Sequence, residues 1–135
     1  MKTVLSWRLN PTALACALAL FVVLVLLATA GARAGWLRSF FGDVLAVTWL
    51  HAVFRSVLAV RPVYLAFAAF STGCALELGQ YLAGLWHWQI PNRVLRVLLG
   101  STPDWSDVLA YGIGLAAILL LEAWRARRIE TGKIA

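Results

Sequence analysis

Charged residues are scarce in this chain. Asp, Glu, Lys and Arg together make up 13% of its 135 residues, and hydrophobic residues make up 62%. A typical soluble domain carries about 25% charged and 45–50% apolar residues. The composition therefore excludes an ordinary soluble globular protein and, more firmly, a disordered one. The short length indicates a single domain, and we expect residues 1–135 to form one integral membrane domain.

Cysteine is scarce too, and recognisable catalytic motifs are missing. The two cysteines, Cys16 and Cys74, both lie inside apolar runs without clustered histidines, which favours buried thiols over a disulfide or a zinc site. The sequence has no nucleophile elbow, no metal-binding histidine pair and no phosphate-binding glycine loop. We therefore expect no metal and no cofactor.

The apolar residues fall into four runs, at residues 12–30, 41–60, 62–86 and 103–124. The first run, as a helix rising 1.5 Å per residue, spans about 28 Å, close to the thickness of the hydrocarbon core. The sequence therefore predicts an all-α fold, a four-helix transmembrane bundle whose partner is the lipid bilayer. Between the third and fourth runs, Asn92 can cap and Gly100 can end a short interfacial helix in the outer loop.

The first run also has features of a signal peptide. Lys2 and Arg8 precede it, and Ala28-Thr29-Ala30 has the small-x-small form of a cleavage site. The apolar part of a signal peptide is usually about 7–15 residues long, and this run is longer. We therefore expect a retained helix.

Most of the basic residues lie at or near the ends of the apolar runs. The chain has 12 basic and 6 acidic residues, a balance that in a soluble protein suggests nucleic acid. Because these positions fit membrane topology, we expect no nucleic-acid partner. Eight of the basic residues fall on the side of the two termini and four on the other side. The positive-inside rule then predicts an inner-membrane protein with cytoplasmic N and C termini.

Polar residues inside the third run need an explanation, because a charge in the bilayer costs about 2.5–3.5 kcal/mol. Glu77 lies deep in the run, with Gln80 three residues later and Gly73 and Gly84 near the same helical face. Small residues allow another helix to approach closely. We therefore expect this face to point into the bundle.

A matching polar face lies on the fourth run. Asp104, Asp107, Tyr111 and Gly114 follow helical spacing, and Asp43 starts the second run at the same membrane level. We expect Asp43, Glu77, Asp104 and Asp107 to converge on an outward-facing pocket.

The same polar residues also fit simpler structural roles. Arg93 and Arg96 would lie over the pocket, and pairing between them and the acids is a purely structural alternative to a binding site. The two arginines can equally contact lipid phosphates from a surface helix. Asp104 can simply cap the dipole of its helix, His51 can pack between helices, and Arg55 can extend to the cytoplasmic side.

These residues carry a family resemblance. The segments Glu77-Leu-Gly-Gln80, Arg93 and Asp104-Trp-Ser-Asp107, with Gly42-Asp43 before them, resemble the domain-of-unknown-function 2809 family of small bacterial membrane proteins. The resemblance covers roughly residues 35–124, marks these polar residues as motif positions and implies no established activity. The pattern is more distantly similar to VanZ-like proteins, one of which is linked to teicoplanin resistance at the cell envelope.

Three functions fit these observations. The first is binding of an envelope lipid or lipid-linked precursor at the outer leaflet, with Arg93 and Arg96 holding an anionic phosphate. The second is a membrane enzyme acting on a lipid head group, with Glu77 or Asp107 as general base. The third is a proton- or cation-linked transport component that uses Glu77, for which only His51 and Arg55 offer a polar path inward.

The charge asymmetry gives a direct test of topology. In a variant without Cys16 and Cys74, a cysteine introduced by Lys133→Cys should resist a membrane-impermeant thiol reagent in intact cells and react after lysis. Labelling of this position in intact cells would contradict cytoplasmic termini.

Overall fold

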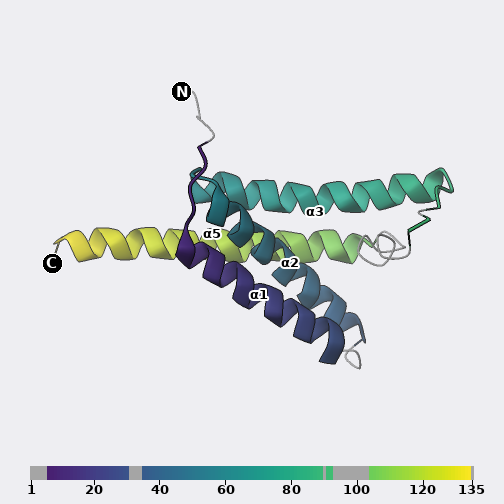
Figure 1. Ribbon diagram of the computed structural model, residues 1–135, viewed down its shortest axis with the longest axis horizontal. Helices are drawn as coiled ribbons and strands as arrows, with labels where there is room; N and C mark the ends of the chain where they lie inside the picture. Colours follow the sequence, from purple (N-terminus) through teal and green to yellow (C-terminus); the bar gives the residue numbers. More distant parts are fainter. Residues whose placement is uncertain (1–5, 31–34, 90, 93–103, 135) are drawn as a thin grey trace.

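The computed structural model describes residues 6–30, 35–89, 91–92 and 104–134. These residues form the helices α1 (Pro11–Thr29), α2 (Gly35–Val57), α3 (Pro62–Leu85) and α5 (Trp105–Ile134) (Figure 1). Each of the four contains a segment long and apolar enough to cross a membrane. The predicted all-α, four-helix fold is confirmed, and the chain is a multi-pass membrane protein.

Two helices differ in extent from the sequence prediction. α2 begins at Gly35 rather than at residue 41, and α5 begins at Trp105 and continues to Ile134, ten residues beyond the expected end. Residues 125–131 contain no proline and are mostly alanine, arginine and glutamate, which favour helix. The apolar run therefore ends at residue 124, whereas α5 continues as a polar helix beyond it.

The helices form two pairs, α1 with α2 and α3 with α5, and α2 joins the pairs. α1 packs against α2, α2 also contacts α3 and α5, and α3 lies beside α5. Figure 1 shows the α1–α2 hairpin crossing the α3–α5 pair at an angle. At one end of the bundle α1 and α3 begin and α2 ends, and we call this the terminal end. The opposite end, where α3 ends and α5 begins, is the loop end.

The segment before α1 is tied to the end of α2. The amide of Arg8 donates to the carbonyl of Val57 at 3.0 Å, and that of Asn10 donates to Ser56 at 2.8 Å. Asn10 also caps α1, since its Oδ1 accepts from the amide of Ala13 at 3.2 Å. These bonds fix the position of Arg8 beside the α2 terminus.

Many of the interior side chains are small, and α5 approaches both α2 and α3 closely. Val47, Ala66, Ala69, Tyr111 and Ile118 form the buried core. A Cβ atom on Gly114 would lie 3.0 Å from the carbonyl oxygen of Val44 on α2, and one on Gly73 would lie 2.9 Å from the Tyr111 ring. Small residues therefore bring α5 close to both α2 and α3, as is usual between membrane helices.

The predicted buried face of α3 is only partly correct. Gly73 and Glu77 are buried and Gln80 is half-buried, but Gly84 is exposed with no atom near its Cβ position. None of the described helices packs on that face in the last turn of α3, so the expectation that Gly84 faces the bundle is wrong.

Gly114 gives a test of the α2–α5 contact. Gly114→Ala should lower the free energy of unfolding by about 1–3 kcal/mol, because the backbone of α2 cannot move away as a side chain would. Gly112→Ala is the matched control, since Gly112 has no neighbour within 4 Å of its Cβ position. That substitution should be neutral or slightly stabilising. Unfolding of both variants in one detergent measures the difference, and an equal effect would contradict the contact.

Candidate ligand-binding site at the loop end

Glu77 is the buried centre of a polar cluster between α3 and α5. Its side chain comes from α3 and is 7% exposed. The Tyr111 hydroxyl donates to Oε1 at 3.2 Å, and the amide of Asp104 donates to Oε2 at 3.3 Å. Gly73, one turn earlier on α3, leaves the space that the Tyr111 ring fills. The local sequence thus places one carboxyl group where each of its oxygens has a donor.

Asp43 and Asp107 form a second carboxyl pair nearby. Asp43 of α2 and Asp107 of α5 lie close to each other at the same end of the molecule. Two ionised carboxylates only accept hydrogen bonds and repel each other, so neither can serve as a donor to the other. The hydroxyl of Ser106 also donates to Asp107 at 3.4 Å, whereas Oδ2 of Asp43 is buried without a hydrogen-bond partner. The pair is therefore only partly satisfied by the residues that the structure describes.

Asp104 has a capping role. It is exposed, precedes the first residue of α5, and its Oδ1 accepts from the amide of Ser106 at 2.9 Å. This hydrogen bond holds the pKa of the Asp104 carboxyl below its ordinary value. The helix-capping alternative left open by the sequence is therefore present in the fold, and it coexists with the contact between the Asp104 amide and Glu77.

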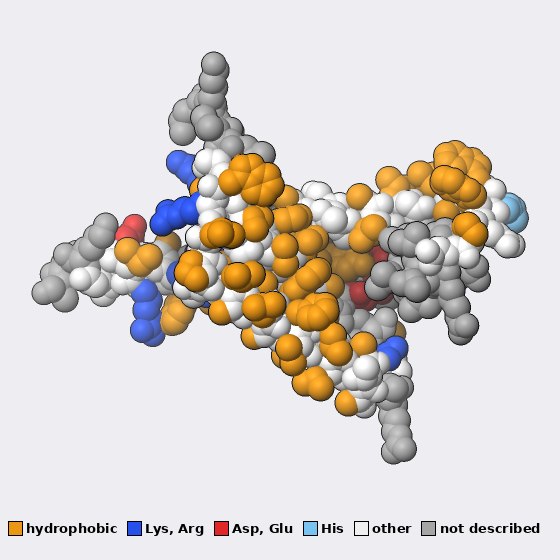
Figure 2. All heavy atoms as spheres, in the orientation of Figure 1, with side chains coloured by type: hydrophobic (Ala, Val, Ile, Leu, Met, Phe, Trp, Pro, Cys, Tyr) orange, Lys and Arg blue, Asp and Glu red, His pale blue; other side chains and the backbone are white. Residues whose placement is uncertain are grey.

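The structure brings four predicted residues into this cluster together with Tyr111. Asp43, Glu77, Asp104 and Asp107 come from three helices to the same end of the molecule, where Figure 2 shows acidic side chains in the gap beside the grey atoms. Gln80 is half-buried one turn beyond Glu77. Arg93, Arg96 and the predicted short helix of the outer loop lie outside the described residues.

A small recess opens beside Glu77. It has a volume of about 200 Å³, and we call it the Glu77 recess. Its lining combines two acids with apolar and aromatic side chains: Cys74, Glu77, Leu78, Tyr81, Asp104, Trp105 and Val108. Within the described part of the chain, no three His, Cys, Asp or Glu side chains are grouped to hold a metal ion. The recess therefore suits a ligand with hydrogen-bond donors and an apolar part.

Sequence reasoning missed a second polar cluster at the terminal end. Arg55 does not extend freely to the membrane surface, because it forms an ion pair with Glu122, which also accepts from Arg125 at 3.1 Å. His51 is buried between helices as one alternative expected, and its Nε2 donates to the carbonyl of Pro62 at 3.3 Å. Glu122, an acid within the fourth apolar run at the level of Arg55, was the available signal.

Tyr111 tests whether the Glu77 cluster stabilises the fold. Tyr111→Phe should lower the free energy of unfolding by about 1–2 kcal/mol, because a buried carboxyl oxygen loses its donor. Tyr64→Phe on α3 is the control, since Tyr64 is 55% exposed and should tolerate the change. Denaturation of both variants in the same micelles gives the comparison. Equal stability of the two would mean that the hydroxyl contributes nothing to the fold.

Comparison with known proteins gives a single positive result. Searches of curated proteins and of solved structures find no significant match. A family model does match residues 32–115, a segment that contains α2, α3 and the acidic cluster. Because the match covers more than half of the chain, the protein belongs to the family described as protein of unknown function, DUF2809.

Proposed function

We propose that this protein binds the head group of an envelope lipid or lipid-linked precursor at the loop end. One observation carries the proposal: the carboxyl group of Glu77, which is almost fully buried, borders a recess that is otherwise lined by Asp104 and by mostly apolar and aromatic side chains. A carboxylate at such a depth is costly and is usually retained for a function. The recess lies between two membrane-spanning helices, where a lipid has direct access.

The lining of the recess indicates the chemistry of the ligand. Glu77 and Asp104 accept hydrogen bonds from hydroxyl, amide or ammonium groups. Trp105 and Tyr81 offer aromatic faces, on which a sugar ring packs or an ammonium group makes a cation–π contact. Leu78 and Val108 cover an apolar portion. The ligand is therefore amphipathic, with donors on its head group.

The charge distribution supports an outer-leaflet position. With eight basic residues on the side of the termini and four on the other, the loop end faces outward and the termini lie in the cytoplasm. The location that we propose is therefore the inner membrane of a cell with an envelope. Arg93 and Arg96 precede Asp104 in the sequence and would bind a lipid phosphate bidentately, while the acids accept from the remainder of the head group.

Proton- or cation-linked transport is the second candidate. The partly satisfied Asp43–Asp107 pair favours it, because two neighbouring acids, one with a buried oxygen that lacks a partner, can take up a proton or a cation. The rest of the fold argues against it. Between Tyr111 and Glu122 the core consists of Val47, Ala66, Ala69 and Ile118, and His51 and Arg55 are already paired. The described residues thus offer no continuous polar path.

Glu77→Gln tests the proposal, because glutamine keeps the size of the side chain and its acceptor for Tyr111. Native mass spectrometry of the protein in membrane-derived vesicles should detect a co-purifying lipid on the wild type. The variant should accumulate normally and retain this lipid at least about tenfold less, since hydrogen bonds to a charged acceptor contribute about 1.5–3 kcal/mol. Glu130→Gln, which removes an exposed acid from α5, should retain it fully.

Three outcomes would contradict lipid-head-group binding through Glu77. Equal lipid retention by all three proteins would remove Glu77 from the site. Low abundance of Glu77→Gln together with normal lipid content on the protein that remains would assign Glu77 to assembly. If the variant instead binds the lipid normally and accumulates an unprocessed form of it in cells, Glu77 acts as a general base and the enzymatic alternative replaces the binding function.

A further inference from the structure

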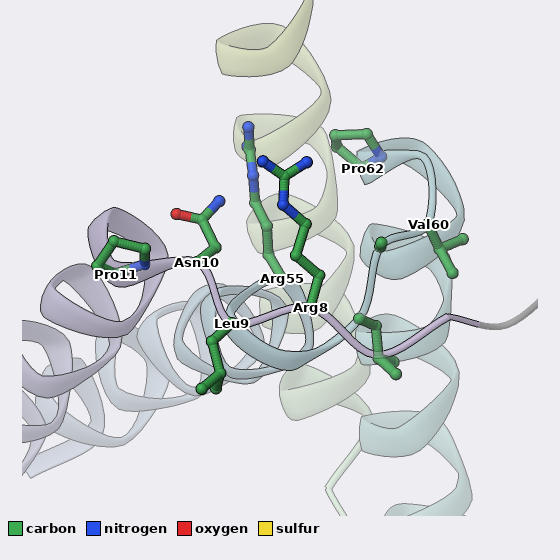
Figure 3. Close-up of a pocket in the computed structure, with 9 residues that line it drawn as sticks. Arg8, Leu9, Asn10, Pro11, Arg55, Val60 and Pro62 are labelled. Atoms are coloured by element: carbon green, nitrogen blue, oxygen red, sulfur yellow. The ribbon is translucent and has the colours of Figure 1, made fainter.

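A recess separate from the Glu77 site lies at the terminal end. Arg8, Asn10 and Arg55 line it between the beginnings of α1 and α3, and its volume is about 310 Å³ (Figure 3). We call it the Arg8 recess. In Figure 3 the side chains of Arg8 and Arg55 extend in the same direction, with the Asn10 side chain on the α1 side.

Positive charge at this recess is not balanced by nearby acids. Glu122 pairs with Arg55 and with Arg125. The Arg8 side chain has no hydrogen bond or ion pair with any residue in the described part of the chain. Two arginines therefore share one carboxylate while Arg8 has no acidic partner among the described residues, and Figure 2 shows further basic side chains gathered at this end. Guanidinium groups that repel one another are stabilised by an anion.

The backbone adds to this preference. Pro11 and Pro62 are the first residues of α1 and α3, and both line the Arg8 recess. The beginning of a helix carries a partial positive charge from its aligned peptide dipoles. Two helix dipoles and two arginine side chains thus favour an anion in the same recess.

An apolar groove adjoins the Arg8 recess. It has a volume of about 740 Å³ and shares Asn10 and Arg55 with the recess. α1 and α5 form its sides across α2, and apolar residues line most of its length, among them Ala19, Leu20, Val23, Ile118 and Leu121. We call it the α1–α5 groove.

The length of the groove matches one leaflet. Along α1 it extends from Thr12 to Val23, a distance of about 17 Å at helical rise. Half of a hydrocarbon core about 30 Å thick is about 15 Å. An acyl chain that starts beside Arg55 would therefore follow the groove to about the middle of the bilayer.

We propose that one anionic phospholipid binds at the terminal end, with its phosphate between Arg8 and Arg55 and an acyl chain in the α1–α5 groove. The site is independent of the Glu77 recess and of the lipid proposed there. It takes a different chemistry, because the arginines recognise a negative charge whereas the acids at the loop end recognise hydrogen-bond donors. Its ligand comes from the leaflet that faces the terminal end.

Native mass spectrometry tests the phosphate contact. The protein is reconstituted in nanodiscs of equal parts phosphatidylcholine and phosphatidylglycerol, and the wild type should release with one phosphatidylglycerol. Arg8→Gln should retain at least about tenfold less, because a charge-assisted hydrogen bond is lost. The backbone bond from residue 8 to Val57 does not depend on the side chain, so the variant should fold. Arg127→Gln is the control. It removes the same charge from the same end, and Arg127 lines neither the Arg8 recess nor the α1–α5 groove.

A second pair of variants tests the groove. Ala19→Trp fills the α1–α5 groove and should lower phosphatidylglycerol retention to a similar extent. Ala15→Trp places the same side chain one turn earlier on α1, outside the groove lining, and should have no effect. Both alanines are exposed, so neither substitution disturbs the core.

Three results would overturn this assignment. Equal retention by the wild type and Arg8→Gln would exclude the recess as the phosphate site. Equal losses in Arg8→Gln and Arg127→Gln would show attraction by overall charge. Binding of inorganic phosphate in pure phosphatidylcholine nanodiscs that depends on Arg8 but not on Ala19 would identify a free anion as the ligand.

Discussion

A charged side chain cannot remain unpaired in the hydrocarbon of a membrane without a large cost, and this constraint determines how the helices are placed. α5 carries the polar groups that have to be matched at both ends of the bundle. Near the loop end its Tyr111 donates to Glu77 of α3, and its Asp107 meets Asp43 of α2. Near the terminal end its Glu122 pairs with Arg55 of α2. Glu77, Arg55 and Glu122 thus each have a partner from another helix.

Close helix packing makes these contacts possible. Gly114 and Gly73 let α5 approach α2 and α3 at the level of the acidic cluster. Ala66, Ala69 and Ala110 are completely buried, so the interface consists of small side chains. α1 packs against α2 and stands apart from α5, which leaves the groove between them. The same packing therefore produces a tight polar cluster at the loop end and leaves the α1–α5 groove open towards the terminal end.

Much of the fold could be predicted because membrane helices leave a strong local signal. The length of the apolar runs indicated four helices, and helical spacing placed Glu77 with Gly73 and Asp107 with Tyr111. The ion pair between Arg55 and Glu122 could not be predicted in this way, since the two residues are 67 positions apart and nothing local relates them. Periodicity likewise could not reveal that α3 extends past its neighbours at Gly84, because the length of a helix says nothing about what covers its end.

The acidic cluster could serve only to hold the helices together, and the surroundings of Glu77 argue for and against that role. Tyr111 and the Asp104 amide satisfy both carboxyl oxygens, yet the side chain still borders an open recess beside exposed aromatic residues. A group that served packing alone would be replaced at little cost by an apolar side chain of similar size. This contrast between satisfied hydrogen bonds and an accessible recess is the reason for proposing that the cluster binds a ligand.

The arrangement around Glu77 is the central claim, and solid-state NMR in lipid bilayers measures it most directly. With ¹³C in the glutamate carboxyl groups and in the tyrosine ring carbon that bears the hydroxyl, the structure predicts a contact between Glu77 and Tyr111 within about 5 Å. The contact should disappear in Glu77→Gln and persist in Glu122→Gln. Absence of this contact in a folded wild-type protein, or its persistence in Glu77→Gln, would contradict the arrangement.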